Sequence, residues 1–109
     1  MSGALVLDDL AVSLRALRSL ALDFGHLAAP AVMVSTIRPE HLELAFHDDL
    51  PGFEAWREAL SIAPDAVTHG IQGAGRTRVL KASVEYLGAT LRLVAYADVP
   101  ALVPVGESA

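Results

Sequence analysis

The sequence predicts an α+β protein with an antiparallel sheet of about five strands, in the order α-β-β-α-β-β-β, and with its helices packed on one face. Three observations predict this fold. Apolar residues recur every three or four positions in two segments, which is the spacing of amphipathic helices. They alternate with polar residues in five shorter segments, which is the spacing of half-buried strands. The links between consecutive strands are short, which favours antiparallel neighbours.

Length and composition are those of one folded domain. The chain has 109 residues, of which 53% are hydrophobic and 19% charged, and this is too apolar for an intrinsically disordered protein. We expect a single α+β domain over residues 1–99. Residues 100–109 contain two prolines and no periodic pattern, so we expect a flexible C-terminal tail there.

The charge balance and the absence of cysteine exclude several classes of protein. Thirteen acidic residues against eight basic ones give a net charge of −5, the opposite sign to the one that a general nucleic-acid binder needs. There is no cysteine, and therefore no disulfide, thiol nucleophile or thiolate metal site. The N-terminal segment lacks the cationic start of a secretory signal, and Asp23, His26 and Pro30 interrupt the most apolar stretch. We expect a cytoplasmic protein that binds no membrane and no cofactor.

The first helix, predicted over residues 8–25, carries more apolar surface than one sheet face needs. Its main stripe includes Leu7, Leu10 and Phe24, and further apolar residues lie beside the stripe. A helix that is apolar on more than one side is usually covered on more than one side. We therefore expect a homodimer, with a dimer face made of four leucines on this helix: Leu10, Leu14, Leu17 and Leu20.

The remaining elements follow in order, each between turn-forming residues. A second helix begins at the capping residues Asp48 and Asp49 and ends at Pro64. Across the turn at Leu87–Gly88, alternation predicts that Leu80, Ala82 and Val84 pair with Ala95, Leu93 and Leu91 and face the core. The strands are expected over residues 31–38, 41–47, 67–72, 76–86 and 89–99.

Glycines between the third and fourth strands form the most suggestive local feature. They do not open a helix and no Walker lysine follows, so a phosphate loop of the nucleotide-binding kind is excluded. A plain hairpin tip is the first interpretation. The alternative is a contact loop whose basic residues grip a carboxylate or phosphate. The residues of this possible contact loop are Gly73, Gly75, Arg76, Arg78, Lys81 and Arg92.

No pattern typical of catalysis or of a metal centre is present. His41, Glu43 and His47 share one strand face, but a strand rises about 3.3 Å per residue, so the two histidines lie about 20 Å apart. One zinc ion cannot bridge that distance. Polar residues on the outer face of the last hairpin could form a recognition surface: Lys81, Ser83, Glu85, Thr90, Arg92 and Tyr96.

About half of the chain resembles small actinobacterial proteins of streptomycete type whose function is unknown. Four segments carry the resemblance: residues 47–50, 53–60, 75–81 and 94–96. The resemblance implies a genomic setting among mobile elements or regulatory neighbours, and no mechanism. The succession of helices and strand pairs is also similar to small dimeric chaperone-like α+β modules, although the strand count after the first helix departs from that pattern.

The function predicted from these observations is a non-enzymatic protein-interaction module, a homodimer that binds another protein in the cytoplasm. One alternative is an accessory nucleic-acid or anion-binding protein that uses the loop at Gly73–Gly75 and its flanking arginines. Another is a small-molecule-binding protein, which requires a cavity with converging polar groups between the second helix and the sheet.

Overall fold

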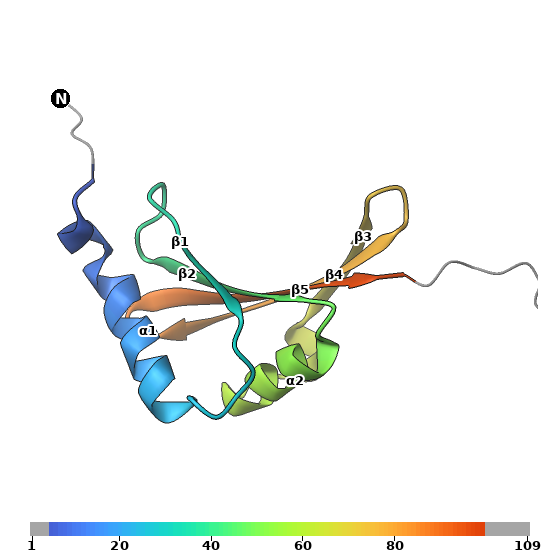
Figure 1. The fold of residues 1–109 in the computed structure, drawn as a ribbon, viewed down its shortest axis with the longest axis horizontal. Coiled ribbons are helices and arrows are strands. Elements are labelled where there is room, and N and C mark those ends of the chain that lie inside the picture. Colours follow the sequence, from blue (N-terminus) through green and yellow to red (C-terminus); the bar gives the residue numbers. More distant parts are fainter. Residues whose placement is uncertain (1–4, 100–109) are drawn as a thin grey trace, which may run out of the picture.

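In the computed structural model, which describes residues 5–99, helices α1 and α2 lie against one face of a five-stranded sheet (Figure 1). The tail expected over residues 100–109 lies outside the described residues. A 3-10 turn at Leu7–Leu10 leads into α1, and another at Pro64–Ala66 follows α2. The elements are α1 (Ala11–Asp23), β1 (Ala31–Val34), β2 (His41–His47), α2 (Leu50–Ala59), β3 (Thr68–Gln72), β4 (Thr77–Tyr86) and β5 (Ala89–Asp98).

The sheet is mixed, and the prediction of a purely antiparallel sheet was wrong. The strand order is β1-β2-β5-β4-β3. The pairs β1–β2, β3–β4 and β4–β5 are antiparallel, but β2 and β5 are parallel, with Leu42 beside Leu91 and Leu44 beside Leu93. Parallel neighbours need a long crossover, and α2, β3 and β4 provide it. The apolar β5 takes the buried centre, whereas β3, whose residues are all exposed, takes an edge.

The predicted register of the last hairpin is confirmed. Leu80 pairs with Ala95, Ala82 with Leu93 and Val84 with Leu91. The turn that sets this register has two residues, Leu87 and Gly88, with φ of 51° and 84°. A two-residue turn with positive φ at both positions matches the twist of the strands it joins.

The core lies between the helices and the face of the sheet that they cover, which we call the covered face. Phe53 and Trp56 from α2 are 0% and 5% exposed, as their helical spacing predicted. Phe53 meets Phe46 of β2 edge-to-face, with ring centroids 6.1 Å apart. Leu80, Leu91 and Leu93, which were predicted to face the core, are buried, and Val84 is partly buried. Leu42, Leu44 and Phe46 of β2 are buried beside them.

Strand β1 ends four residues earlier than predicted, at Val34. The Ser35 Oγ accepts hydrogen bonds from the backbone N–H groups of Ile37 and Arg38, each at 3.0 Å. A serine that captures nearby backbone donors in this way turns the chain out of the ladder. The segment after β1 is therefore a shaped loop, and it carries Arg38 out of the expected strand.

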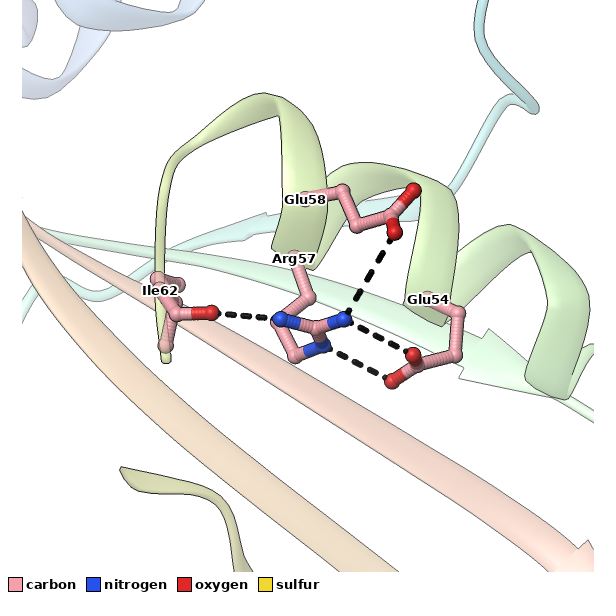
Figure 2. Close-up of polar contacts among 4 residues, drawn as sticks. All are labelled: Glu54, Arg57, Glu58 and Ile62. Atoms are coloured by element: carbon pink, nitrogen blue, oxygen red, sulfur yellow. Dashed lines mark hydrogen bonds and ion pairs between the residues drawn. The ribbon is translucent and has the colours of Figure 1, made fainter. Parts of the chain in front are cut away.

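Polar side chains form hydrogen bonds at both ends of helix α2. At its start the Asp49 Oδ1 accepts from the Gly52 N–H at 3.0 Å, so the expected aspartate cap is present. Near its end Arg57 is 7% exposed and donates to the Ile62 carbonyl at 2.6 Å (Figure 2). Arg57 thus fixes the chain where it leaves α2 and turns toward β3.

Candidate functional site

The opposite face of the sheet carries no helix within the described residues, and we call it the open face (Figure 1). The β1–β2 and β3–β4 hairpins bend toward this side at the two ends of the sheet (Figure 1). Three apolar residues on the open face are buried: Ala45, Val79 and Val94, which are 7%, 5% and 1% exposed. The polar residues expected on the outer face of the last hairpin lie here, since Lys81, Ser83 and Glu85 pair with Val94, Arg92 and Thr90.

The largest hollow on the open face lies at its β1–β2 end. It has a volume of about 460 Å³ and draws residues from the β1–β2 loop and from four strands, β1, β2, β4 and β5. Two arginines and a histidine contribute basic groups, and a single glutamate contributes an acidic one. The lining residues are Met33, Ser35, Arg38, His41, Leu42, Glu43, Ser83, Thr90 and Arg92.

Arg92 and Glu43 face each other across the parallel pair β2–β5. The Arg92 Nε lies 3.9 Å from the Glu43 Oε1, and the two side chains are 42% and 27% exposed. That distance makes an ion pair but exceeds a hydrogen bond. The neighbouring Thr90 hydroxyl donates to the Glu85 carboxylate at 2.9 Å. Arg92 is therefore held loosely beside the hollow.

The loop that carries Arg38 and His41 is fixed by three hydrogen bonds. The His41 N–H donates to the Arg38 carbonyl at 2.9 Å and closes the turn. The Thr90 N–H donates to the Glu40 carbonyl at 2.9 Å. The Ser13 Oγ, on the fully buried side of α1, donates to the Pro39 carbonyl at 2.6 Å. Sequence reasoning missed Arg38, although Pro39 directly after it marked a turn.

The structure divides the predicted contact loop into two places. Gly73 and Gly75 have φ of 66° and 82°, as the tip of a hairpin requires, and Arg76 is exposed beside them. Arg78 pairs with Ala97 on the covered face, whereas Arg92 pairs with Ser83 near the other end of β4. Lys81 lies between them and lines a smaller hollow of about 250 Å³ along β3.

The predicted dimer face is divided between the interior and the surface. Leu20 is 1% exposed and belongs to the core, while Leu10 and Leu17 are half-buried. Leu14 is 36% exposed and borders a hollow of about 400 Å³ on the outer side of α1. The residues around this hollow are Leu7, Asp8, Ala11, Leu14, Arg15 and Arg18. The sequence predicted that Leu7 belongs to the main apolar stripe of the first helix, but in the structure Leu7 is 71% exposed.

The histidines that invited a metal hypothesis lie apart. His41 borders the large hollow, whereas His47 stacks on Tyr96 with ring centroids 5.1 Å apart. Among residues 5–99, no group of three or more His, Asp or Glu side chains is placed to hold a metal ion.

The region between α2 and the sheet, where a small-molecule site would need a cavity, holds Phe53 and Trp56. The Trp56 Nε1 donates to the Ala28 carbonyl at 2.8 Å. An apolar hollow of about 190 Å³ lies next to Trp56 and is lined mostly by α1 and the link to β1. Among the described residues that line this hollow, Trp56 is the one with a polar side-chain atom, so polar side chains do not converge on it.

The buried arginine of α2 donates to Glu54 on its own helix and to the Ile62 carbonyl just after it. The Arg57 Nε and Nη2 each donate to the Glu54 carboxylate at 2.9 Å, and Glu58 lies 4.0 Å away (Figure 2). This bidentate hydrogen bond lowers the pKa of Glu54, against a smaller opposing effect of burial, and raises the pKa of Arg57. The group stabilises the fold, because all three guanidinium nitrogens of Arg57 donate to acceptors of the protein itself.

Neither helix of the described segment has the length and apolar character needed to cross a bilayer. The fold and its surfaces define an α+β protein with one covered and one open sheet face. Comparison with protein-family models, with curated proteins and with solved structures finds no match to this chain.

Proposed function

We propose that this protein is a non-enzymatic protein-interaction module that works in the cytoplasm as a homodimer, with the two copies paired through the outer side of α1. The observation that carries the proposal is the composition of that surface. Leu7 and Leu14 supply exposed apolar area, Asp8 lies toward one end, and Arg15 and Arg18 lie toward the other. Exposed apolar area bordered by charge is typical of protein interfaces.

The surface is complementary to itself. A two-fold interface uses the same patch on both copies. If two copies of α1 pack antiparallel about an axis between Ala11 and Leu14, Asp8 of each copy lies beside Arg18 of the other. Leu14 then lies near the centre of the contact, opposite Ala11 of the other copy, and Leu7 lies at its ends beside the two ion pairs. A parallel arrangement would instead bring the arginines together.

The apolar area extends beyond the helix. Leu5 and Val6, which precede the 3-10 turn, are 43% and 62% exposed. Burial of apolar area contributes about 25 cal/mol per Å², so these side chains add to the same contact. No residue of the turn Leu7–Leu10 is buried within a single copy. Burial of this turn against the second copy would account for its apolar residues.

Sedimentation equilibrium of the full chain at micromolar concentration tests the proposal. We expect twice the 11.5 kDa mass of one chain. Leu14→Glu should give a monomer, because it places a charge at the centre of the interface. Leu22→Glu is the matched control, since Leu22 is 74% exposed on α1 but does not border the hollow, and it should remain a dimer.

A charge exchange tests the arrangement of the two copies. Arg18→Asp should weaken the dimer by placing two acidic side chains together. The double variant Asp8→Arg with Arg18→Asp should restore it, because the ion pair is then reversed. A monomeric wild-type protein, or equal effects of Leu14→Glu and Leu22→Glu, would overturn the proposal.

A further inference from the structure

We propose that the large hollow on the open face binds the oxyanion group, carboxylate or phosphate, of a small molecule. This site is separate from the outer side of α1 and does not depend on the homodimer. Three basic side chains line one hollow: Arg38 from the β1–β2 loop, His41 at the start of β2, and Arg92 from β5, which is distant from both in the chain. The chain as a whole carries a net charge of −5, so this local cluster opposes the overall charge.

Arg92 can bind an anion without first losing strong partners. Its contact with Glu43 uses Nε at 3.9 Å, and within residues 5–99 no hydrogen bond ties its two Nη groups. A guanidinium pairs best with a carboxylate or phosphate through two parallel hydrogen bonds. Glu43 neutralises part of the local charge, so it should limit affinity for an anion.

Hydroxyl groups add neutral donors to the same hollow. The Ser35 oxygen already accepts two backbone N–H groups, which leaves its own proton free to donate to a ligand. Ser83 lines the hollow beside Arg92, its partner across β4–β5. Thr90 contributes less, because its hydroxyl donates to Glu85.

The loop is held in place before any ligand arrives. Hydrogen bonds to the carbonyls of Arg38, Pro39 and Glu40 hold three consecutive residues of the turn. A preorganised loop loses little conformational entropy on binding, which favours affinity. The bonds to Pro39 and Glu40 come from Ser13 and Thr90, so α1 and β5 together set the position of Arg38.

The size of the hollow indicates the class of ligand. Its volume of about 460 Å³ lies within the usual range for small-molecule sites and exceeds the need of a single inorganic anion. Met33, which is 62% exposed, forms an apolar part of the wall. A small molecule with one anionic end and an apolar body matches this combination.

The experiment is an NMR titration of the full-length, ¹⁵N-labelled protein at constant ionic strength, with inorganic phosphate in one arm and succinate in the other. We expect saturating shifts at Arg92 Nε and at the amides of Ser35 and His41. The arm with the tighter binding identifies phosphate or carboxylate as the preferred group. Shifts that grow linearly in both arms would overturn the proposal.

Charge-matched variants separate a built site from general attraction. Arg92→Gln should weaken binding about tenfold, and Arg76→Gln, which removes an exposed arginine at the distant hairpin tip, should leave it unchanged. Glu43→Gln should strengthen binding a few-fold. The amide spectrum reports whether each variant is folded, and Arg38→Gln on the exposed loop gives a second loss-of-binding variant. Equal effects of Arg92→Gln and Arg76→Gln would contradict the site.

Discussion

Ser13 of α1 donates a hydrogen bond from its Oγ to the backbone carbonyl of Pro39, 26 residues away in the chain, at 2.6 Å. Ser13 is 0% exposed, so water cannot replace this contact. The bond ties the helix on the covered side to the turn that shapes the open face. It is the most direct link between the core and the proposed oxyanion site.

Replacement of Ser13 by alanine should lower the free energy of unfolding by about 1–3 kcal/mol, because the hydrogen bond is lost and the half-buried Pro39 carbonyl loses its partner. Urea denaturation measures the change. Ser19→Ala is the control on the same helix: its hydroxyl lies 2.9 Å from the Tyr86 hydroxyl in a half-buried position, so a smaller loss is expected. Equal losses of stability in the two variants would mean that the buried Ser13–Pro39 hydrogen bond contributes no more than the half-buried Ser19–Tyr86 contact.

The hydrogen bond from Arg57 should make stability depend on pH in the acid range. It lowers the pKa of Glu54 in the folded protein below the ordinary value of 4.5. Its contribution is therefore complete above that value and is lost as the pH falls through the lower, folded pKa. Urea midpoints measured from pH 6 to pH 2 should show this loss in the wild-type protein and less of it in Glu54→Gln. Glu58→Gln, whose carboxylate lies 4.0 Å from Arg57, should retain the wild-type profile.

Phe53→Ala should cost about 3–5 kcal/mol of stability, because it removes a fully buried ring and leaves a cavity. The edge-to-face contact with Phe46 is lost with it. Ile71→Ala provides the comparison, since Ile71 is 64% exposed on the edge strand β3 and should change stability by less than about 0.5 kcal/mol. Denaturant unfolding of both variants measures the two losses of stability. Similar losses would refute this description of the core.

Leu87→Asn should stabilise the protein by about 0.5–1 kcal/mol. Leu87 has a φ of 51°, a left-handed conformation that costs most side chains about 1–2 kcal/mol. Asparagine tolerates it better and, before Gly88, forms the preferred pair for such a turn. The leucine is 63% exposed, so little burial is lost. Thermal unfolding should show a higher midpoint for Leu87→Asn and a lower one for Leu87→Val.

Local patterns in the sequence predicted the two helices and the five strands, but not the early ends of β1 at Val34 and of α2 at Ala59. The two-residue turn at Leu87–Gly88 and the alternation on either side fix which residues of β4 and β5 meet. The spacing of Phe53 and Trp56 shows which side of α2 is buried. Each of these relationships lies within a few residues of chain, where periodicity and turn chemistry decide the structure.

The strand order could not be predicted in this way. Alternation assigns Leu44 and Leu93 to the same face but does not say that their strands are neighbours. The parallel pairing of β2 with β5 depends on the whole sheet, in which the long and largely buried β5 occupies the centre. The proposed oxyanion site depends on that pairing, because it brings Arg92 beside Glu43 and next to the loop that holds Arg38.

The parallel pairing of β2 with β5 also constrains how the chain acquires its structure. β5 follows the other four strands in chain order, so on the ribosome the central strand emerges after its neighbours. Until then β2 exposes an apolar side and an unpaired edge, and closing the intervening loop carries an entropic cost before any contact compensates it. The nascent chain is thus most vulnerable to aggregation just before its last strand is released.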